Sequence, residues 1–457
     1  MQTKSVFCRK VHFRILMPIL VLIIDFFNPK IAFPQGHIFY PYKRIFSQDS
    51  TFVSLNVLYK EGTTKSTKNA VILYIQNYYQ NFINHVNSAR GTHMFLNFFI
   101  FYCPCDSLLC NVNVIPVGGS GGSINPPPPP PPGPGGSGDF VSIIANNLNM
   151  QKNSDQESID TTGFYKESVI KSFPIKKDKI IAIMDTGLDP AYFKNIDHLI
   201  WRDIQHPTIY NFLPGAILNH SLDDHLYKHG TAVAALILHE LNKGTSYPRI
   251  MILKVLDSKN RGTTFSASCA LSYAAQKDAT LVNASLGYYS SITGSTGDPV
   301  LENYIERCKK SDIIVAAGNT LTPPPHGPDL CHPGNTNELI GTRLFFPACF
   351  STTLSNVIAV TTVSNSYTNC KYQNFSSKFV SIGVKTNNAN CCAVSVPFLN
   401  ALYEGSSFAT PIVTGRLMKY FLQNSIGMPH GAGDLHFISS QNPRLSGTTV
   451  DSRFIER

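Results

Sequence analysis

Apolar and polar residues along the second half of the chain follow two alternating patterns. Short apolar runs typical of strands recur there, separated by longer segments whose apolar residues repeat every three or four positions. The predicted strands cover residues 179–184, 250–256, 280–284, 313–317 and 357–363, and the predicted helices cover residues 231–241, 266–276 and 300–309. This alternation predicts a mostly parallel sheet with helices on both faces, a three-layer α/β fold. In such a sheet, functional groups gather at the carboxyl ends of the strands.

A smaller pattern lies near the start of the chain. Residues 53–59 and 94–102 have the composition of strands, and apolar residues at helical spacing predict a helix over residues 67–86. We therefore expect a small α+β module within residues 34–116, with a βαβ-like order of elements.

A Gly/Pro-rich segment separates the two patterns. Residues 117–139 contain glycine-rich stretches on either side of a run of seven prolines, Pro126 to Pro132. Glycine makes a chain flexible, whereas consecutive prolines form a stiff polyproline II helix. We expect a spacer here, with the second domain at residues 140–457. Residues 118–122 fit the G-x-S-x-G pattern of α/β-hydrolases, but that nucleophile needs a strand before it and a helix after it.

The first 33 residues have the pattern of an export signal. Basic residues precede an apolar stretch from Ile15 to Ile24. The stretch is shorter than a bilayer requires and contains Pro18, so we expect no stable membrane span. Residues 1–33 are therefore predicted to be a signal peptide, and the protein is expected to be secreted or exported to the cell envelope. An uncleaved anchor or a buried helix is the alternative.

Composition narrows the class of protein. Of 457 residues, 43% are hydrophobic and only 15% are charged, which favours a well-buried enzyme domain over a disordered chain. The formal charge is +9, but no run of lysine and arginine marks a nucleic-acid arm, so no nucleic-acid partner is expected. Eleven cysteines make disulfides plausible in an exported protein, although spacing does not reveal their pairing. Cys103, Cys105 and Cys110 imitate a zinc knuckle, but no second ligand pair accompanies them.

Three short motifs carry the candidate chemistry. Asp185-Thr186-Gly187 follows a buried strand, a position that many aspartates occupy only as turn or cap residues. His229-Gly230-Thr231 opens a predicted helix, where a histidine facing a cleft can act as a base, although a lone histidine is often structural. The segment 405–415 reads GSSFATPIVTG and places Ser407 where a loop becomes a helix, with Pro411 expected in the first turn.

These motifs, in this order, resemble the Asp, His, Ser signature of subtilisin-like serine proteases. The similarity covers roughly residues 175–425 and includes further ordered matches at residues 252–257, 282–287, 315–319, 346–348, 357–360 and 374–376. The resemblance implies the subtilisin-like three-layer fold and a serine endopeptidase that acts on polypeptides. The alternatives are a catalytically silent member of the fold that binds peptides, and an esterase or lipase, whose nucleophile elbow and Ser, Asp, His order are missing.

The resemblance also implies a role for individual residues. Asp185, His229 and Ser407 form the catalytic triad, and Asn319 supplies the oxyanion-hole amide. The expected substrate-binding residues lie in two segments at the ends of predicted strands: Ser285, Leu286 and Gly287 in the first, and Ala316, Ala317 and Gly318 in the second. The first segment is expected to pair with an extended substrate as an added strand.

Several positions depart from the family pattern. Ala232 stands where a histidine commonly follows His-Gly-Thr, and Ser406 and Phe408 replace the usual Thr and Met beside the nucleophile. None of these changes removes a reacting group. Between Asn319 and Phe346 lies an insertion in the region that usually lines the primary specificity pocket, which leaves the residue preference open.

Metal binding is not required by this interpretation. His220, His225 and His229 with Asp223 and Asp224 could be taken for a metal cluster, but the Gly-Thr after His229 fits the triad better. Many relatives hold calcium in a loop after the histidine helix, whereas residues 241–249 here contain no Asp or Glu. Calcium prefers about six to eight oxygen ligands, including carboxylates. We expect no required cofactor, with weak calcium binding near Asp223 and Asp224 as the remaining option.

The module at residues 34–116 loosely resembles the inhibitory prosegments of subtilisins, and an unrelated binding module is the rival interpretation. A prosegment makes the chain a zymogen. We expect the enzyme itself to be a monomer.

Overall fold

The computed structural model describes residues 53–90, 93–117, 141–146, 149–151, 168–203, 210–213, 222–290, 297–319, 337–341, 343–370, 372–386, 393–396, 401–425 and 431–456. The chain forms two compact units: the first takes in residues up to 148 together with residues 298–300, and the second takes in residues 149–297 and 301–457. The predicted signal peptide, and the spacer apart from Val117, lie outside the described residues.

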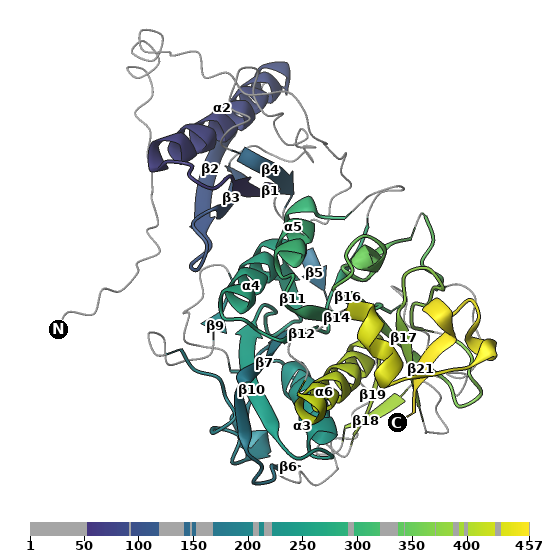
Figure 1. Ribbon diagram of the computed structural model, residues 1–457. Coiled ribbons are helices and arrows are strands. Elements are labelled where there is room, and N and C mark those ends of the chain that lie inside the picture. Colours follow the sequence, from purple (N-terminus) through teal and green to yellow (C-terminus); the bar gives the residue numbers. More distant parts are fainter. Residues whose placement is uncertain are drawn as a thin grey trace, which may run out of the picture. The chain divides into compact units, whose positions relative to one another are not determined.

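The first unit is a four-stranded antiparallel sheet with one helix (Figure 1). Its elements are β1 (Val53–Tyr59), α2 (Lys65–Arg90), β2 (Phe95–Tyr102), β3 (Leu109–Val117) and β4 (Val141–Asn146). The strand order is β2-β3-β1-β4, so β3 inserts between the two strands of the predicted βαβ-like unit. A core of apolar side chains, among them Val71, Ile75 and Val112, lies between α2 and the sheet.

The boundary between the units differs from the predicted one. Strand β4 follows the Gly/Pro-rich segment, yet it pairs with β1 from Leu55↔Asn146 to Tyr59↔Val141. Residues 141–146 therefore belong to the first unit, and the segment at 117–139 connects two strands of one sheet. The sequence pattern did not reveal this, because strand pairing depends on residues far apart in the chain.

The second unit has the predicted α/β architecture. Its nine-stranded sheet has the order β20-β21-β17-β16-β14-β12-β7-β10-β9. Neighbouring strands in it are parallel, except that the edge strand β20 runs antiparallel to β21. The strands are β7 (Ile175–Asp185), β9 (Tyr210–Asn211), β10 (Tyr247–Lys254), β12 (Leu281–Ala284), β14 (Asp312–Ala316), β16 (Val357–Val363), β17 (Ile382–Lys385), β20 (Ser440–Gln441) and β21 (Arg453–Ile455).

Four helices accompany this sheet: α3 (His229–Leu241), α4 (Thr264–Gln276), α5 (Pro299–Arg307) and α6 (Ser406–Asn424). Side chains on one face of the sheet, such as Ile181, Ile252 and Ile314, pack with α3 and α6 in one apolar core. Their neighbours in the strands, such as Ala182 and Leu253, point to the opposite face and are also buried. Both faces are therefore covered, as the fold prediction required.

Short strand pairs and 3₁₀ turns complete the second unit. The pairs are β5 (Asn149–Gln151) with β11 (Arg261–Thr263), β6 (Ser168–Val169) with β8 (Phe193–Lys194), β13 (Tyr288–Tyr289) with β15 (Phe345–Phe346), and β18 (Ala393–Val396) with β19 (Ala401–Glu404). The turns are η1 (Pro190–Tyr192), η2 (Ala348–Thr352), η3 (Gly431–Phe437), η4 (Pro443–Leu445) and η5 (Val450–Ser452). Within the described residues, no helix has the length and apolar character needed to cross a bilayer.

Candidate active site

A buried carboxylate and imidazole meet where a central strand ends. Asp185 is the last residue of β7, and His229 is the first residue of α3. Asp185 Oδ1 lies 2.6 Å from His229 Nδ1, and the two side chains are 1% and 0% exposed. A carboxylate only accepts hydrogen bonds, so Nδ1 carries the proton and Nε2 is the basic nitrogen. This is the pairing that the sequence predicted.

The turn after Asp185 fixes the carboxylate. The same Oδ1 accepts a hydrogen bond from Thr186 N at 2.7 Å, and Thr186 Oγ1 lies 3.3 Å from it. The Asp185 carbonyl in turn accepts from the backbone of Val255 at 2.9 Å. A Cβ placed on Gly230 would lie 2.3 Å from Gly187 O, so the start of α3 approaches this turn too closely for any side chain.

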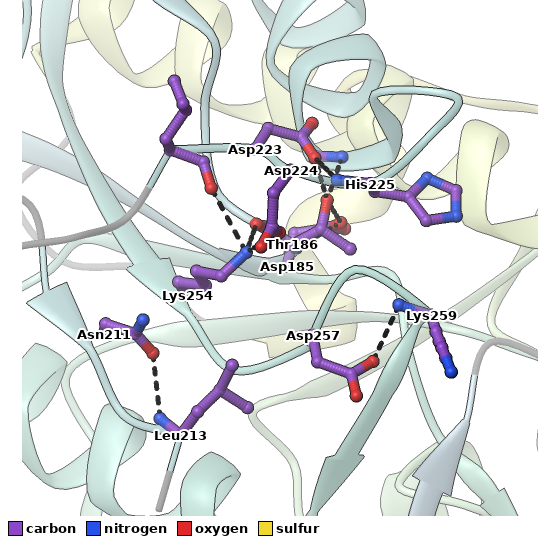
Figure 2. Close-up of polar contacts among 12 residues, drawn as sticks. Asp185, Thr186, Asn211, Leu213, Asp223, Asp224, His225, Lys254, Asp257 and Lys259 are labelled. Atoms are coloured by element: carbon purple, nitrogen blue, oxygen red, sulfur yellow. Dashed lines mark hydrogen bonds and ion pairs between the residues drawn. The ribbon is translucent and has the colours of Figure 1, made fainter. Parts of the chain in front are cut away.

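A second buried carboxylate, Asp223, links the two loops. Its Oδ1 accepts from Thr186 Oγ1 at 2.9 Å, and its Oδ2 accepts from Thr231 N at 2.9 Å and from Thr231 Oγ1 at 2.7 Å. Thr186 follows Asp185 in sequence, and Thr231 lies two residues after His229. Asp223 is 0% exposed and lies beside the Asp185 turn in Figure 2. It therefore connects the segments that carry Asp185 and His229.

A buried lysine supports the same turn. Lys254, at the end of β10, donates to the carbonyl oxygens of Thr186 and, at 3.2 Å, of Leu222, and to Asp224 Oδ1 at 2.6 Å (Figure 2). Its side chain is 2% exposed, so the ammonium group depends on these acceptors. Sequence reasoning did not find the roles of Asp223 and Lys254. For Asp223, the available signal in the sequence was a threonine close to each of its two neighbours: Thr186 directly after Asp185, and Thr231 two residues after His229.

The nucleophile candidate lies at the start of α6, next to His229. Helix α6 packs against α3, and the ring of Phe408, the residue after Ser407, lies edge-on to the His229 ring with 5.0 Å between centroids. Gly405 precedes the helix with φ 132°, a conformation that favours glycine, and turns the chain into α6. The structure thus brings Ser407 to the same end of the unit as Asp185 and His229.

Pro411 gives the nucleophile's backbone an unusual partner. It is the sixth residue of α6 rather than part of the first turn, as the sequence had suggested. Proline has no N–H, so it cannot bond the carbonyl four residues earlier, which belongs to Ser407. Ser285 Oγ donates to that carbonyl at 2.8 Å instead. Asn283 Nδ2 donates to Ser285 Oγ at 3.0 Å, and Thr414 Oγ1 donates to Asn283 Oδ1 at 2.9 Å. Thr414 therefore orients the Asn283 amide, and Asn283 positions the Ser285 hydroxyl.

The Asn319 amide is oriented by the residue before the nucleophile. Its Oδ1 accepts from Ser406 N at 3.0 Å and from Ser406 Oγ at 3.2 Å. A backbone N–H only donates, so the atom facing it must be the oxygen, and Nδ2 points away from Ser406. This arrangement leaves the amide N–H₂ as the end of the side chain that can serve a reacting oxygen.

Both predicted substrate segments contact this helix start, through Ser285 Oγ on Ser407 O and Gly318 N on Ser406 Oγ. Ser285, Leu286 and Gly287 follow β12, while Ala316 ends β14 and is followed by Ala317 and Gly318. Strands β12 and β14 are neighbours in the sheet. All six residues are buried.

The described residues contain no group of three His, Cys, Asp or Glu side chains arranged to hold a metal ion. The carboxylates considered for weak calcium binding are engaged by protein donors, Asp223 with threonines and Asp224 with Lys254. Among the three cysteines that imitate a zinc knuckle, Cys103 Sγ and Cys105 Sγ are 3.4 Å apart, while Cys110 Sγ lies 3.6 Å from Tyr59 OH. Burial raises the pKa of the Cys110 thiol to about 12, which disfavours the thiolate that zinc requires.

Comparison with known proteins agrees with the resemblance stated from the motifs. The model of the subtilase family matches residues 176–423, which is more than half of the chain. A cell wall-associated protease of Bacillus subtilis (strain 168) is 34% identical over 116 residues, or 24% of this chain. The matched region spans only 12% of that relative's length.

Proposed function

The chain belongs to the subtilase family of serine proteases, and on that premise we propose that it is an active endopeptidase with Asp185, His229 and Ser407 as its triad. The observation that carries the proposal is the buried 2.6 Å contact between Asp185 and His229, beside a helix whose second residue is Ser407. Polypeptides are the expected substrates.

Each side chain has a defined role in acyl transfer. A serine hydroxyl is a weak nucleophile, so His229 Nε2 takes the Ser407 proton during attack and returns it to the leaving amine. Asp185 accepts from Nδ1–H, which fixes the tautomer and stabilises the imidazolium that forms. The acyl-enzyme ester is then hydrolysed by water through the same proton transfers in the second half of the cycle.

The tetrahedral intermediate needs fixed hydrogen-bond donors. Asn319 Nδ2 supplies one of them, because Ser406 holds the amide oxygen and so sets the direction of the N–H₂ group. The Ser407 N–H supplies the other, since the first N–H groups of a helix are not used by the helix itself. Both donors are in place before reaction, so little reorganisation is needed in the transition state.

Labelling with a fluorophosphonate tests the triad directly. We expect covalent labelling of the wild-type protein and cleavage of casein, with both lost in Ser407→Ala. Because only a hydroxyl is removed, Ser407→Ala should keep the wild-type melting temperature. A folded wild-type protein that is neither labelled nor active would support the alternative, a catalytically silent subtilase that binds peptides.

The oxyanion donor is tested by Asn319→Ala. We expect turnover to fall about a hundred- to thousandfold with KM nearly unchanged, the range known for the equivalent change in a subtilisin. Full turnover in Asn319→Ala would mean that another donor stabilises the oxyanion.

We also propose that the chain is made as a zymogen. Strand β5 pairs antiparallel with β11, from Arg261↔Gln151 to Thr263↔Asn149, and it also contacts β13, which follows Gly287. An extended substrate is expected to add as a strand at this place. On this proposal residues 149–151 lie along the substrate path, and only residues 147 and 148 separate them in sequence from β4 of the first unit. This contact favours the prosegment interpretation of the first unit over an unrelated module.

Self-processing tests the zymogen proposal. The wild-type chain should be cut within a few residues after Gln151, whereas Ser407→Ala should remain intact under the same conditions, as measured by mass spectrometry. Met150→Asp should raise the activity of the uncut chain, because Met150 is 1% exposed on β5 and a charge there weakens the pairing. An uncut wild-type chain with full activity would contradict the proposal.

Export through residues 1–33 completes the proposed function. The printed name of the Bacillus relative, a cell wall-associated protease, is consistent with an exported enzyme. Expression in a secreting host should release a protein that lacks this segment, and its N-terminal sequence would show the cut. A chain retained in the cytoplasm with Met1 intact would contradict export.

A further inference from the structure

In the proposed reaction, the substrate residue that is acylated onto Ser407 binds between the two predicted substrate segments. Segment 285–287 reaches the nucleophile through the 2.8 Å bond from Ser285 Oγ to Ser407 O. On the other side, Gly318 N donates to Ser406 Oγ at 3.0 Å, and Asn319 follows. With its acyl carbon on Ser407 Oγ and its oxygen turned toward Asn319, the substrate residue directs its side chain into the gap between Gly287 and Gly318.

The ring of Phe345 fills this gap. A Cβ placed on Gly287 would lie 2.4 and 2.5 Å from Cε1 and Cζ of Phe345. A Cβ placed on Gly318 would lie 2.7 and 2.8 Å from Cγ and Cδ1 of the same ring. One ring therefore lies against both glycines, with its Cε1 and Cζ atoms at Gly287 and its Cγ and Cδ1 atoms at Gly318. Phe345 is 2% exposed, so it is part of the packed interior rather than a surface side chain.

Neighbouring residues keep the ring in position. Strand β15 carries Phe345 and pairs with β13, where Tyr289 is its partner and stacks edge-on at 5.0 Å. The Tyr289 hydroxyl donates to Asn319 O at 2.6 Å and accepts from Arg343 Nη2 at 3.1 Å. Moving the ring out of the gap would disturb Tyr289 and, through it, the oxyanion residue. We therefore expect the Phe345 ring to stay in this position when a substrate binds.

We infer that Phe345 determines specificity by restricting the acylated residue to glycine, alanine or serine, an inference that rests on the proposed protease function. A larger side chain would have to displace a buried ring, and close-packed interiors tolerate such overpacking poorly. Substrates that differ only at this position should therefore differ in transition-state binding, which appears in kcat/KM.

The test uses the processed protein from the full-length chain and quenched peptides that differ only at the acylated residue. For the wild type, we expect kcat/KM to be at least tenfold higher with alanine than with phenylalanine. Phe345→Gly should raise kcat/KM for the phenylalanine peptide at least tenfold and change the alanine peptide little. Phe350→Leu is the matched control, since Phe350 is equally buried but faces Gly297, and it should keep the wild-type preference.

Two outcomes would overturn the inference. One is a wild-type enzyme that cleaves alanine and phenylalanine peptides equally well. The other is a folded Phe345→Gly protein, checked by its melting temperature, with the wild-type preference unchanged. If Phe345→Gly does not fold, the same comparison is made with Phe345→Val, together with the wild-type ratio of kcat/KM for the alanine and phenylalanine peptides. Fluorophosphonate labelling separates the two proposals. If the protein is labelled but cleaves both peptides equally well, only the role of Phe345 is overturned. If it is not labelled, the protease function is overturned as well.

Discussion

At the scale of single residues, Asp223 joins the segment that carries Asp185 to the segment that carries His229. Asp223→Ala removes the acceptor of the Thr231 amide and of two threonine hydroxyls. We expect the free energy of unfolding to fall by about 2–4 kcal/mol, because buried donors are left unpaired. Turnover should fall about tenfold or more with little change in KM, since 1.36 kcal/mol in the barrier corresponds to tenfold in rate.

Two further variants distinguish positioning by Asp223 from a general loss of stability. Asp223→Asn keeps one acceptor oxygen and should recover part of the turnover. Asp197→Ala is the control, because the Asp197 side chain is 83% exposed and its ion pair with Arg202 lies on the surface. Wild-type kinetics in Asp223→Ala would show that Thr186 and Thr231 are held by other contacts.

A second buried carboxyl, Asp312, makes stability depend on pH. Burial, and then the nearby Asp434 charge, raise the pKa of Asp312 from 3.8 to about 7, while the bond from Gly431 N opposes the shift. The folded state therefore binds more protons than the unfolded state between about pH 4 and 7, and stability falls as the pH rises through this window. Asp312→Asn should be about 2–4 kcal/mol more stable than wild type at pH 8 and similar to it at pH 4. Denaturant melts at both pH values check this, and an equal effect at both would contradict it.

At the scale of elements, Pro411 and Ser285 are coupled across the start of α6. Ser285→Ala should lower the free energy of unfolding by about 1–3 kcal/mol, because the buried Ser407 carbonyl loses its donor. Pro411→Ala supplies an N–H to the same carbonyl. The double variant should therefore lose less stability than Ser285→Ala alone, which a double-mutant cycle measures. Strictly additive effects would mean that the two residues act independently.

Elements were predictable where their own side chains determine them. Strand β16 has the predicted bounds, because its seven residues are all buried and are all β-branched or apolar. Helix α3 begins at His229, two residues before its predicted start, since its first turn is polar and small. Strand β4 joined the other unit because its partner, β1, lies far away in sequence.

The same distinction holds for the site. Asp185, His229, Ser407 and Asn319 stand in local motifs, and the structure brings them to one end of the sheet, although their catalytic roles stay predictions. The contacts of Asp223 and the place of the Phe345 ring depend on tertiary packing, which no local pattern records. Sequence therefore indicated the reacting groups better than the residues that orient them or limit the substrate.

At the scale of the whole molecule, we propose that stability does not depend on tightly bound calcium. The connection from α3 to β10 has no Asp or Glu, and Glu240 at the end of α3 is engaged by Lys243 and Arg416. Chelator treatment should shift the melting temperature by only a few degrees or less, because an ion stabilises the fold only in proportion to its binding. A large decrease that calcium reverses would reveal a strong site elsewhere.

The place of the Gly/Pro-rich segment within the first sheet has a consequence for fragment behaviour. Strands β3 and β4 both run antiparallel to β1, on either side of it, so they are parallel to each other. The segment between them is a crossover that must return along a nine-residue strand of about 30 Å. A proteolytic cut in this crossover would break the chain but leave β4 paired with β1. The two fragments should therefore elute together in gel filtration until denaturant is added.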